Sequence, residues 1–189
     1  MGTGQSGHIA SVGYDLYCQL VTDAIEELKG NDTTPEVPVS IDLPVDAFLP
    51  ETFISTESAR IQSYRRLAEA TSIDELEQLN SEWKDRFGEV PEQAVMLVEL
   101  AKLRVLVTQH NVSAVTYRSG PGLGGPEAFI RLNDLEIPVS VQLRLKRLYP
   151  GSEIREANEN QSAYVDIGLS DSDQTNDAYE IVQSLIGIS

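Results

Sequence analysis

The sequence predicts an α+β protein, with an N-terminal helical appendage and then helices packed on a small, mostly antiparallel sheet. Apolar residues follow helical spacing through much of residues 12–109, and strand-like segments dominate after residue 112. Helices grouped first and hairpins later are typical of α+β rather than alternating α/β proteins. A hydrophobic content of 41% in 189 residues is enough for a genuine core.

The N-terminal part is predicted to be a helical appendage. Residues 1–10 are rich in glycine, and apolar residues at helical spacing predict a helix over 12–29 that ends at Gly30. Residues 31–38 contain two prolines and two threonines without periodicity, which is typical of a linker. The predicted organisation is therefore an appendage over 1–30, a linker over 31–38 and a domain over 39–189.

The domain is expected to begin with a short strand and three helices. Alternating apolar residues over 39–43 predict the strand, which the following proline ends. The first helix is expected over 57–70. Ser72 and Glu75 form a capping box for the second helix, which runs to Phe87. Gly88 stops it, and a third helix over 91–109 carries one apolar side: Ala94, Leu97, Val98, Ala101, Val105 and Thr108.

The rest of the domain is predicted to contain two hairpins and a closing helix. Residues 137–149 fit two patterns, because their apolar residues alternate like a strand and also recur like a short helix. We favour the helix. The strands are expected over 112–118, 127–133, 153–158 and 163–169, and the last helix over 176–188.

The charge of the chain limits its partners. Thirty acidic residues stand against 14 basic ones, which gives a net charge of -16. That charge repels nucleic acid and favours a basic protein surface, so we expect no direct nucleic-acid contact. The single cysteine, Cys18, excludes an internal disulfide and a cysteine zinc site, and it fits a reducing, cytoplasmic location. No apolar run approaches membrane-spanning length, so no membrane association is expected.

The motifs give no reason to expect a catalytic site, a metal site or a cofactor in this chain. The glycine-rich residues 120–125 lack the lysine and the following helix that a phosphate-binding loop needs, so they predict a hairpin connection. Residues 171–177 lack the glycine and glutamate of a calcium loop and instead suit a helix cap. Neither His8 nor His110 has a catalytic or metal-ligating partner visible in the sequence.

The candidate site is a charged helix end that holds Glu82, Asp85 and Arg86. Their spacing of three and four residues places them on one exposed face of a helix. Two interpretations remain open on the pattern alone. The simpler one is a solvated face, where a Glu82–Arg86 pair contributes only about 0.3–0.5 kcal/mol. The other is a surface that docks another protein.

A rival interpretation uses the cations. Arg65 and Arg66 stand together, as do Arg144, Lys146 and Arg147. As one patch they would form a nucleic-acid-binding accessory module, which a steep salt dependence of binding would reveal.

The chain resembles the C-terminal region of bacterial transcription-repair coupling factors over nearly its whole length. Several spaced blocks in the right order are far more specific than one short motif. The blocks are Gln5-Ser6-Gly7, Val12-Gly13-Tyr14-Asp15-Leu16-Tyr17, Asp46-Ala47-Phe48-Leu49-Pro50, residues 60–67, and Glu82 through Pro91.

The resemblance implies a parent protein that is an ATP-dependent DNA translocase. Such a protein uses ATP and Mg, moves on double-stranded DNA, displaces stalled RNA polymerase and recruits nucleotide-excision repair through UvrA. Gln5, Ser6 and Gly7 resemble the last piece of its translocation motif. No Walker motif is present in the chain, so we expect it not to hydrolyse ATP by itself.

The resemblance also implies a role for the candidate site. In this family the terminal domain packs on an N-terminal module that resembles the excision-repair protein UvrB, and it covers the UvrA-binding surface. The family's contact residues fall in the Glu-x-x-Asp-Arg-Phe-Gly run, which here gives Glu82, Asp85 and Arg86. The hypothesis is therefore an autoinhibitory protein-docking domain without catalytic activity.

Overall fold

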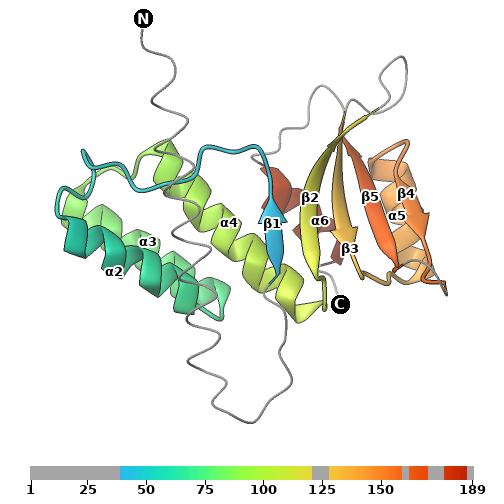
Figure 1. The fold of residues 1–189 in the computed structure, drawn as a ribbon, viewed down its shortest axis with the longest axis horizontal. Helices are drawn as coiled ribbons and strands as arrows, with labels where there is room; N and C mark the ends of the chain where they lie inside the picture. Colours follow the sequence, from blue (N-terminus) through green and yellow to red (C-terminus); the bar gives the residue numbers. More distant parts are fainter. Residues whose placement is uncertain (1–38, 121–127, 159–161, 170–176, 187–189) are drawn as a thin grey trace, which may run out of the picture. The chain divides into compact units, whose positions relative to one another are not determined.

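The computed structural model describes residues 39–120, 128–158, 162–169 and 177–186 of the chain. This part contains five helices and a five-stranded, mostly antiparallel sheet, which confirms the predicted α+β class (Figure 1). The predicted helix over 12–29, the linker over 31–38 and the Gln5-Ser6-Gly7 motif lie outside the described residues.

The helices and strands follow the predicted order along the described chain. Residues 139–148 form a helix, which confirms the choice of helix for 137–149: Leu145 is fully buried while Val139 and Leu143 face solvent, which the alternation of a strand does not allow. The elements are β1 (Ser40–Asp42), α2 (Glu57–Glu69), α3 (Ile73–Phe87), α4 (Glu92–Gln109), β2 (Ala114–Ser119), β3 (Ala128–Asn133), α5 (Val139–Leu148), β4 (Glu153–Arg155), β5 (Tyr164–Leu169) and α6 (Ala178–Ile186).

The described residues form two compact units. The first contains residues 46–105 and is helical, and the second contains 39–45 together with the residues after 105. The predicted boundary between the appendage and the domain falls before residue 39, and it stays a prediction.

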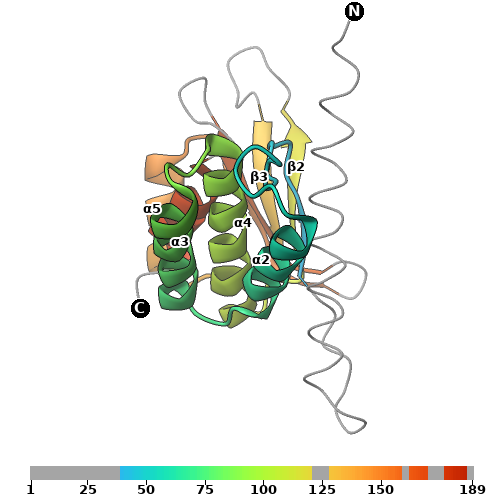
Figure 2. The ribbon, with the colours of Figure 1, turned by 90° about the vertical axis from the view of Figure 1, so that its left-hand side faces the viewer.

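The first unit has an aromatic and aliphatic core between α2 and α3, which run beside one another in Figure 1, whereas in the view of Figure 2 α4 is seen between them. Trp83 on α3 is 1% exposed, and the ring of Phe53 meets it edge-on with centroids 6.4 Å apart. Tyr64 on α2 is also buried, and its hydroxyl oxygen accepts a hydrogen bond of 2.8 Å from the backbone N–H of Leu49. Trp83 is therefore a packing residue of this core.

Helix α3 begins and ends where its sequence predicts. The Ser72 hydroxyl accepts a hydrogen bond of 3.3 Å from the backbone N–H of Glu75. The Glu75 carboxylate reaches back to the N–H of Thr71 at 2.8 Å, one residue earlier than in the usual capping box. Gly88 ends the helix with φ of 94°, a backbone conformation that favours glycine.

Helix α4 corrects one prediction. We expected a single apolar side ending at Thr108, but Thr108 is exposed. Burial instead extends around more of the helix, because eight of the eleven positions over 97–107 are apolar and the three charged residues among them are half-buried. The predicted residues before Thr108 are buried, and so are Leu100, Leu103, Leu106 and Val107.

The second unit is built on the sheet, whose strand order is β1-β2-β3-β5-β4. β1 pairs with β2 in parallel and the other pairs are antiparallel, so both predicted hairpin pairings are confirmed. In β3, buried and half-buried residues alternate, so Ile130 and Leu132 point into the core. The predicted connections over 121–126 and the cap over 171–176 lie outside the described residues.

A buried ion pair lies on the other face of this sheet. Arg131 donates from Nε to Asp166 Oδ1 at 2.6 Å and from Nη2 to Oδ2 at 2.5 Å, and Asp166 is 4% exposed. The Arg131 guanidinium also stacks 3.8 Å from the centroid of the Tyr164 ring. The hydrogen bonds to Asp166 raise the pKa of Arg131 above its ordinary value.

Candidate docking surface on helix α3

The docking triad, which we define as Glu82, Asp85 and Arg86, lies on the last two turns of α3. The core-facing stripe of this helix is apolar and ends at Trp83. The triad is rotated away from that stripe, so Asp85 and Arg86 are exposed and Glu82 is half-buried. The predicted placement on one accessible face therefore matches the structure.

Glu82 bridges two helices. Its Oε1 accepts a hydrogen bond of 3.2 Å from Arg86 Nη1, which is the pair expected from the sequence. Its Oε2 lies 2.7 Å from Nη1 of Arg66 on α2. The hydrogen bond from Arg66, with that from Arg86, holds the pKa of Glu82 below its ordinary value. Sequence analysis missed the Arg66 contact, because no local spacing connects the two residues.

Arg86 and Asp85 differ in their surroundings. The Arg86 guanidinium lies 5.0 Å from the centroid of the Phe87 ring, so a cation–π contact and the Glu82 pair both hold it. Asp85 is exposed, and the structure gives it no ion pair within the described residues. Its carboxylate sits in the last turn, where the helix dipole disfavours negative charge. Glu82 lies three residues earlier and adds a like charge.

A shallow hollow extends from the triad toward the start of α3. The four carboxylates that line this hollow lie on α3 between Asp74 and Asp85, over roughly 16 Å of helix, so they do not converge on one point. No group of acidic, histidine or cysteine residues in the described part of the chain is arranged to hold a metal ion. The hollow has a volume of about 550 Å³ and is lined by Asp74, Glu77, Gln78, Ser81, Glu82 and Asp85.

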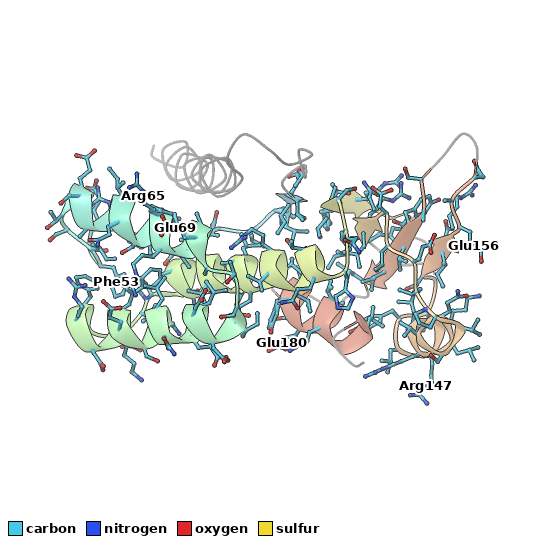
Figure 3. All side chains as sticks on the ribbon, turned by 90° about the horizontal axis from the view of Figure 1, so that it is seen from below. Phe53, Arg65, Glu69, Arg147, Glu156 and Glu180 are labelled. Atoms are coloured by element: carbon cyan, nitrogen blue, oxygen red, sulfur yellow. The ribbon has the colours of Figure 1, made fainter. Side chains whose placement is uncertain are left out.

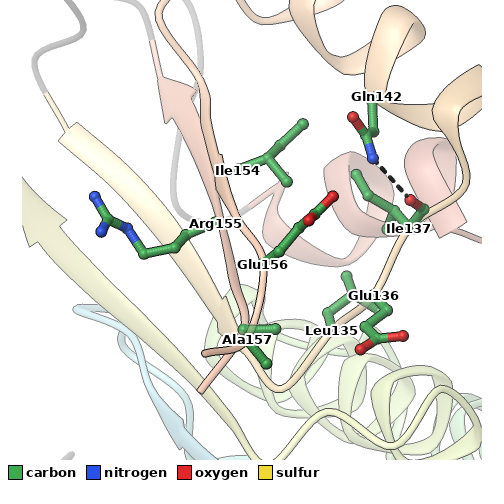
Figure 4. Close-up of a pocket in the computed structure, with 9 residues that line it drawn as sticks. Leu135, Glu136, Ile137, Gln142, Ile154, Arg155, Glu156 and Ala157 are labelled. Carbon is green, nitrogen blue, oxygen red and sulfur yellow. Dashed lines mark hydrogen bonds between the residues drawn. The ribbon is translucent and has the colours of Figure 1, made fainter. Parts of the chain in front are cut away.

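The second unit has a cavity of about 360 Å³ between β4 and the start of α5 (Figure 4). Gln142 Nε2 donates to the backbone oxygen of Ile137 at 3.1 Å across its wall. Arg155 lies at its edge, with its guanidinium 5.8 Å from the ring centroid of Tyr164. The described lining supplies carboxylates but no hydroxyl, thiol or imidazole: Leu135, Glu136, Ile137, Gln142, Ile154, Arg155, Glu156, Ala157 and Ala163.

The cations of the rival interpretation belong to different units. Arg65 and Arg66 lie on α2 in the first unit, and Arg66 is paired with Glu82. The other three, Arg144, Lys146 and Arg147, lie on α5 in the second unit. One of the five cations is therefore already neutralised by the protein itself.

The fold and this surface define an α+β domain with an acidic, ion-paired helical face. No helix in the described part of the chain combines the length and hydrophobicity that crossing a membrane requires. Residues 43–123 match the TRCF domain family. The chain belongs to this family and corresponds to the C-terminal TRCF-domain region of transcription-repair-coupling factor, not to the helicase motor.

Curated relatives support this assignment. The transcription-repair-coupling factor of Mycobacterium bovis is 41% identical over 166 residues, which cover 82% of this chain and 13% of that protein. That of Bacillus subtilis is 37% identical over 116 residues, covering 61% and 10%. The chain thus spans only a small part of these relatives. A crystal structure of the C-terminal domain of transcription-repair coupling factor has the same fold, with a TM-score of 0.57 and 22% identity over 79% of this chain and 88% of that one.

Proposed function

We propose that this chain is a non-catalytic, autoinhibitory docking domain of a transcription-repair-coupling factor. The parent protein would use ATP and Mg to move on double-stranded DNA in the cytoplasm, displace stalled RNA polymerase and recruit UvrA. The chain would cover the UvrA-binding surface of the parent's N-terminal, UvrB-like module. The observation that carries this proposal is the Asp85 carboxylate, which has no ion pair in the part of the chain that the structure describes, beside a Glu82 and an Arg86 that are held in place.

Docking is favoured because the surface is organised before a partner arrives. Arg66 and Arg86 fix the Glu82 carboxylate, and the Phe87 ring supports Arg86. A partner therefore orders few side chains on binding, which lowers the entropic cost. Asp85 gains most from a partner cation, because the dipole of its own helix disfavours its charge. We expect the partner to present an arginine or lysine to Asp85.

The proposed contact need not be tight. Covalent connection within one parent protein supplies an effective concentration of roughly millimolar. A contact with a micromolar dissociation constant would then favour the covered state over the uncovered state about a thousandfold, which corresponds to a free-energy difference near 4 kcal/mol. Loss of a desolvated charge pair costs about 2–5 kcal/mol, which is enough to remove most of that preference.

The decisive experiment changes two carboxylates of the triad in the intact parent protein. Glu82→Ala combined with Asp85→Ala should increase UvrA binding in the absence of DNA and ATP. The matched control, Glu89→Ala with Glu153→Ala, removes two exposed carboxylates outside the triad and should leave UvrA binding unchanged. Unchanged UvrA binding in the triad variant would show that the assigned contact is wrong.

A simpler experiment uses separated parts. The chain should bind the parent's purified N-terminal module, and the affinity should fall as salt is raised, because the contact is between charges. If the two parts ignore each other at high concentration and low salt, the masking role is refuted.

A further inference from the structure

Helix α5 presents apolar residues to solvent on the side opposite its core contact. Leu145 is fully buried, whereas Val139 is 69% and Leu143 is 67% exposed. At 3.6 residues per turn, these two side chains share an arc of roughly 100° with Lys146 and Arg147. We call this arc, formed by Val139, Leu143, Lys146 and Arg147, the outer face of α5. No acidic residue occurs in the helix.

The cations of the outer face have no ion pair within the described part of the chain, although the protein contains 30 acidic residues. Figure 3 shows the Arg147 side chain extending away from the helix. Cations in the last turn of a helix are stabilised by its dipole, which accounts for Lys146 and Arg147. The dipole does not account for two aliphatic side chains left in water one and two turns earlier.

We propose that the outer face of α5 is a docking surface for an acidic amphipathic helix of a partner protein. Val139 and Leu143 lie one helical turn apart and would contact apolar residues of that helix. Lys146 and Arg147 lie about 10–12 Å from Val139 along the axis and would pair with carboxylates two turns further along the partner. The surface is separate from the docking triad, so it does not depend on the proposed masking role.

The composition of the outer face favours this occupant over nucleic acid. Phosphates gain nothing from exposed Val139 and Leu143, and α5 offers only three cations in a chain of net charge -16. An acidic helix uses both the apolar and the charged half of the face. It also carries fewer negative charges than a DNA duplex, so the acidic chain repels it less.

The test measures binding to the full chain by NMR. The probe is a synthetic helical peptide with leucines one turn apart and a pair of glutamates two turns further along. Its addition should shift backbone amide signals of α5. Leu143→Ser should weaken the affinity about tenfold, and so should Lys146→Glu with Arg147→Glu, because each change removes one half of the contact.

Two controls make the outcome specific. Arg65→Glu changes an exposed cation on α2 and should leave the peptide affinity unchanged. A peptide with lysines in place of its glutamates should bind the Lys146→Glu, Arg147→Glu variant better than the original chain. Since all changed side chains on α5 are exposed, thermal unfolding should show that the variants remain folded.

The same titrations with a short DNA duplex and with phosphatidylserine vesicles test whether nucleic acid or a membrane binds this face instead. Binding of the duplex that needs Lys146 and Arg147 but not Leu143 would overturn the proposal in favour of a nucleic-acid surface. Preferential binding to vesicles would overturn it in favour of a membrane surface. Absence of peptide-induced shifts on α5 at millimolar concentration would also refute it.

Discussion

The bridge between α2 and α3 at Glu82 gives the most direct test of the structure. Glu82 lies 2.7 Å from Arg66 and 3.2 Å from Arg86, and the three side chains are 38%, 43% and 59% exposed, respectively. Ion pairs with this exposure contribute about 0.2–1 kcal/mol each, because water and salt screen them. Glu82→Gln should therefore lower the free energy of unfolding by about 1 kcal/mol.

A double-mutant cycle isolates the Arg66 contact. Arg66→Met and Glu82→Gln, alone and together, should show a coupling energy of about 0.5 kcal/mol at low salt in urea unfolding. The coupling should shrink in molar salt, where the Debye length falls to about 3 Å. Arg65→Met is the matched control, because Arg65 is the exposed neighbour of Arg66 and has no ion pair within the described residues. The geometry would be refuted if Glu82 coupled as strongly to Arg65 as to Arg66, or if it showed no coupling to Arg66 at low salt.

The pH dependence of the same coupling has a definite sign. The folded-state pKa of Glu82 is lowered, chiefly by the hydrogen bond from Arg66. The stabilisation is therefore fully present above the unfolded-state pKa of glutamate, about 4.3, and is lost as the pH falls through the lower, folded-state pKa. Coupling that grows on acidification would contradict the assignment.

Further predictions concern the buried contacts, and all use urea unfolding. Tyr64→Phe should cost about 1–3 kcal/mol, since it leaves the backbone N–H of Leu49 without its acceptor, and a neutral effect would mean that another acceptor replaces it. Trp83→Ala should cost about 3–5 kcal/mol through the cavity it leaves; a loss under 1 kcal/mol would contradict its burial. Arg131→Met should cost about 3 kcal/mol, because it removes both hydrogen bonds from the buried Asp166 carboxylate and leaves it, among the described residues, only Arg118 Nη1 at 3.8 Å; the added change Asp166→Leu should restore much of the loss.

Local chemistry explains why much of the fold was predictable. Ser72 and Gly88 mark the ends of α3 through contacts within a few residues, so the signal is present in the sequence itself. The strands and their hairpin pairings follow from alternation and short separations in the same way. Residues 137–149 were harder, because their pattern fits a strand and a helix equally well. Packing of Leu145 and exposure of Leu143 decided for the helix.

In the candidate site too, local spacing predicted some contacts, and the packing of the helices set the others. Spacing alone placed Glu82, Asp85 and Arg86 on one face, and it predicted the Glu82–Arg86 pair that the structure contains. It could not reveal that Arg66 reaches Glu82 from the neighbouring helix, because that distance depends on how α2 packs on α3. Nor could it predict that the ring of Phe53 would meet the buried Trp83.

By itself, the sequence determined the family, the α+β class, the ends of α3 and the accessible face that carries the docking triad, since each rests on residue identity or on short-range backbone geometry. The tertiary structure alone decided which of these charges are satisfied within the molecule. It pairs Glu82 with Arg66 and Asp166 with Arg131, and among the described residues it gives no ion pair to Asp85 or to the cations of the outer face of α5. The physical reason is that ion pairing and burial depend on distances between segments that are far apart in the chain, and those distances are set only when the helices and strands pack.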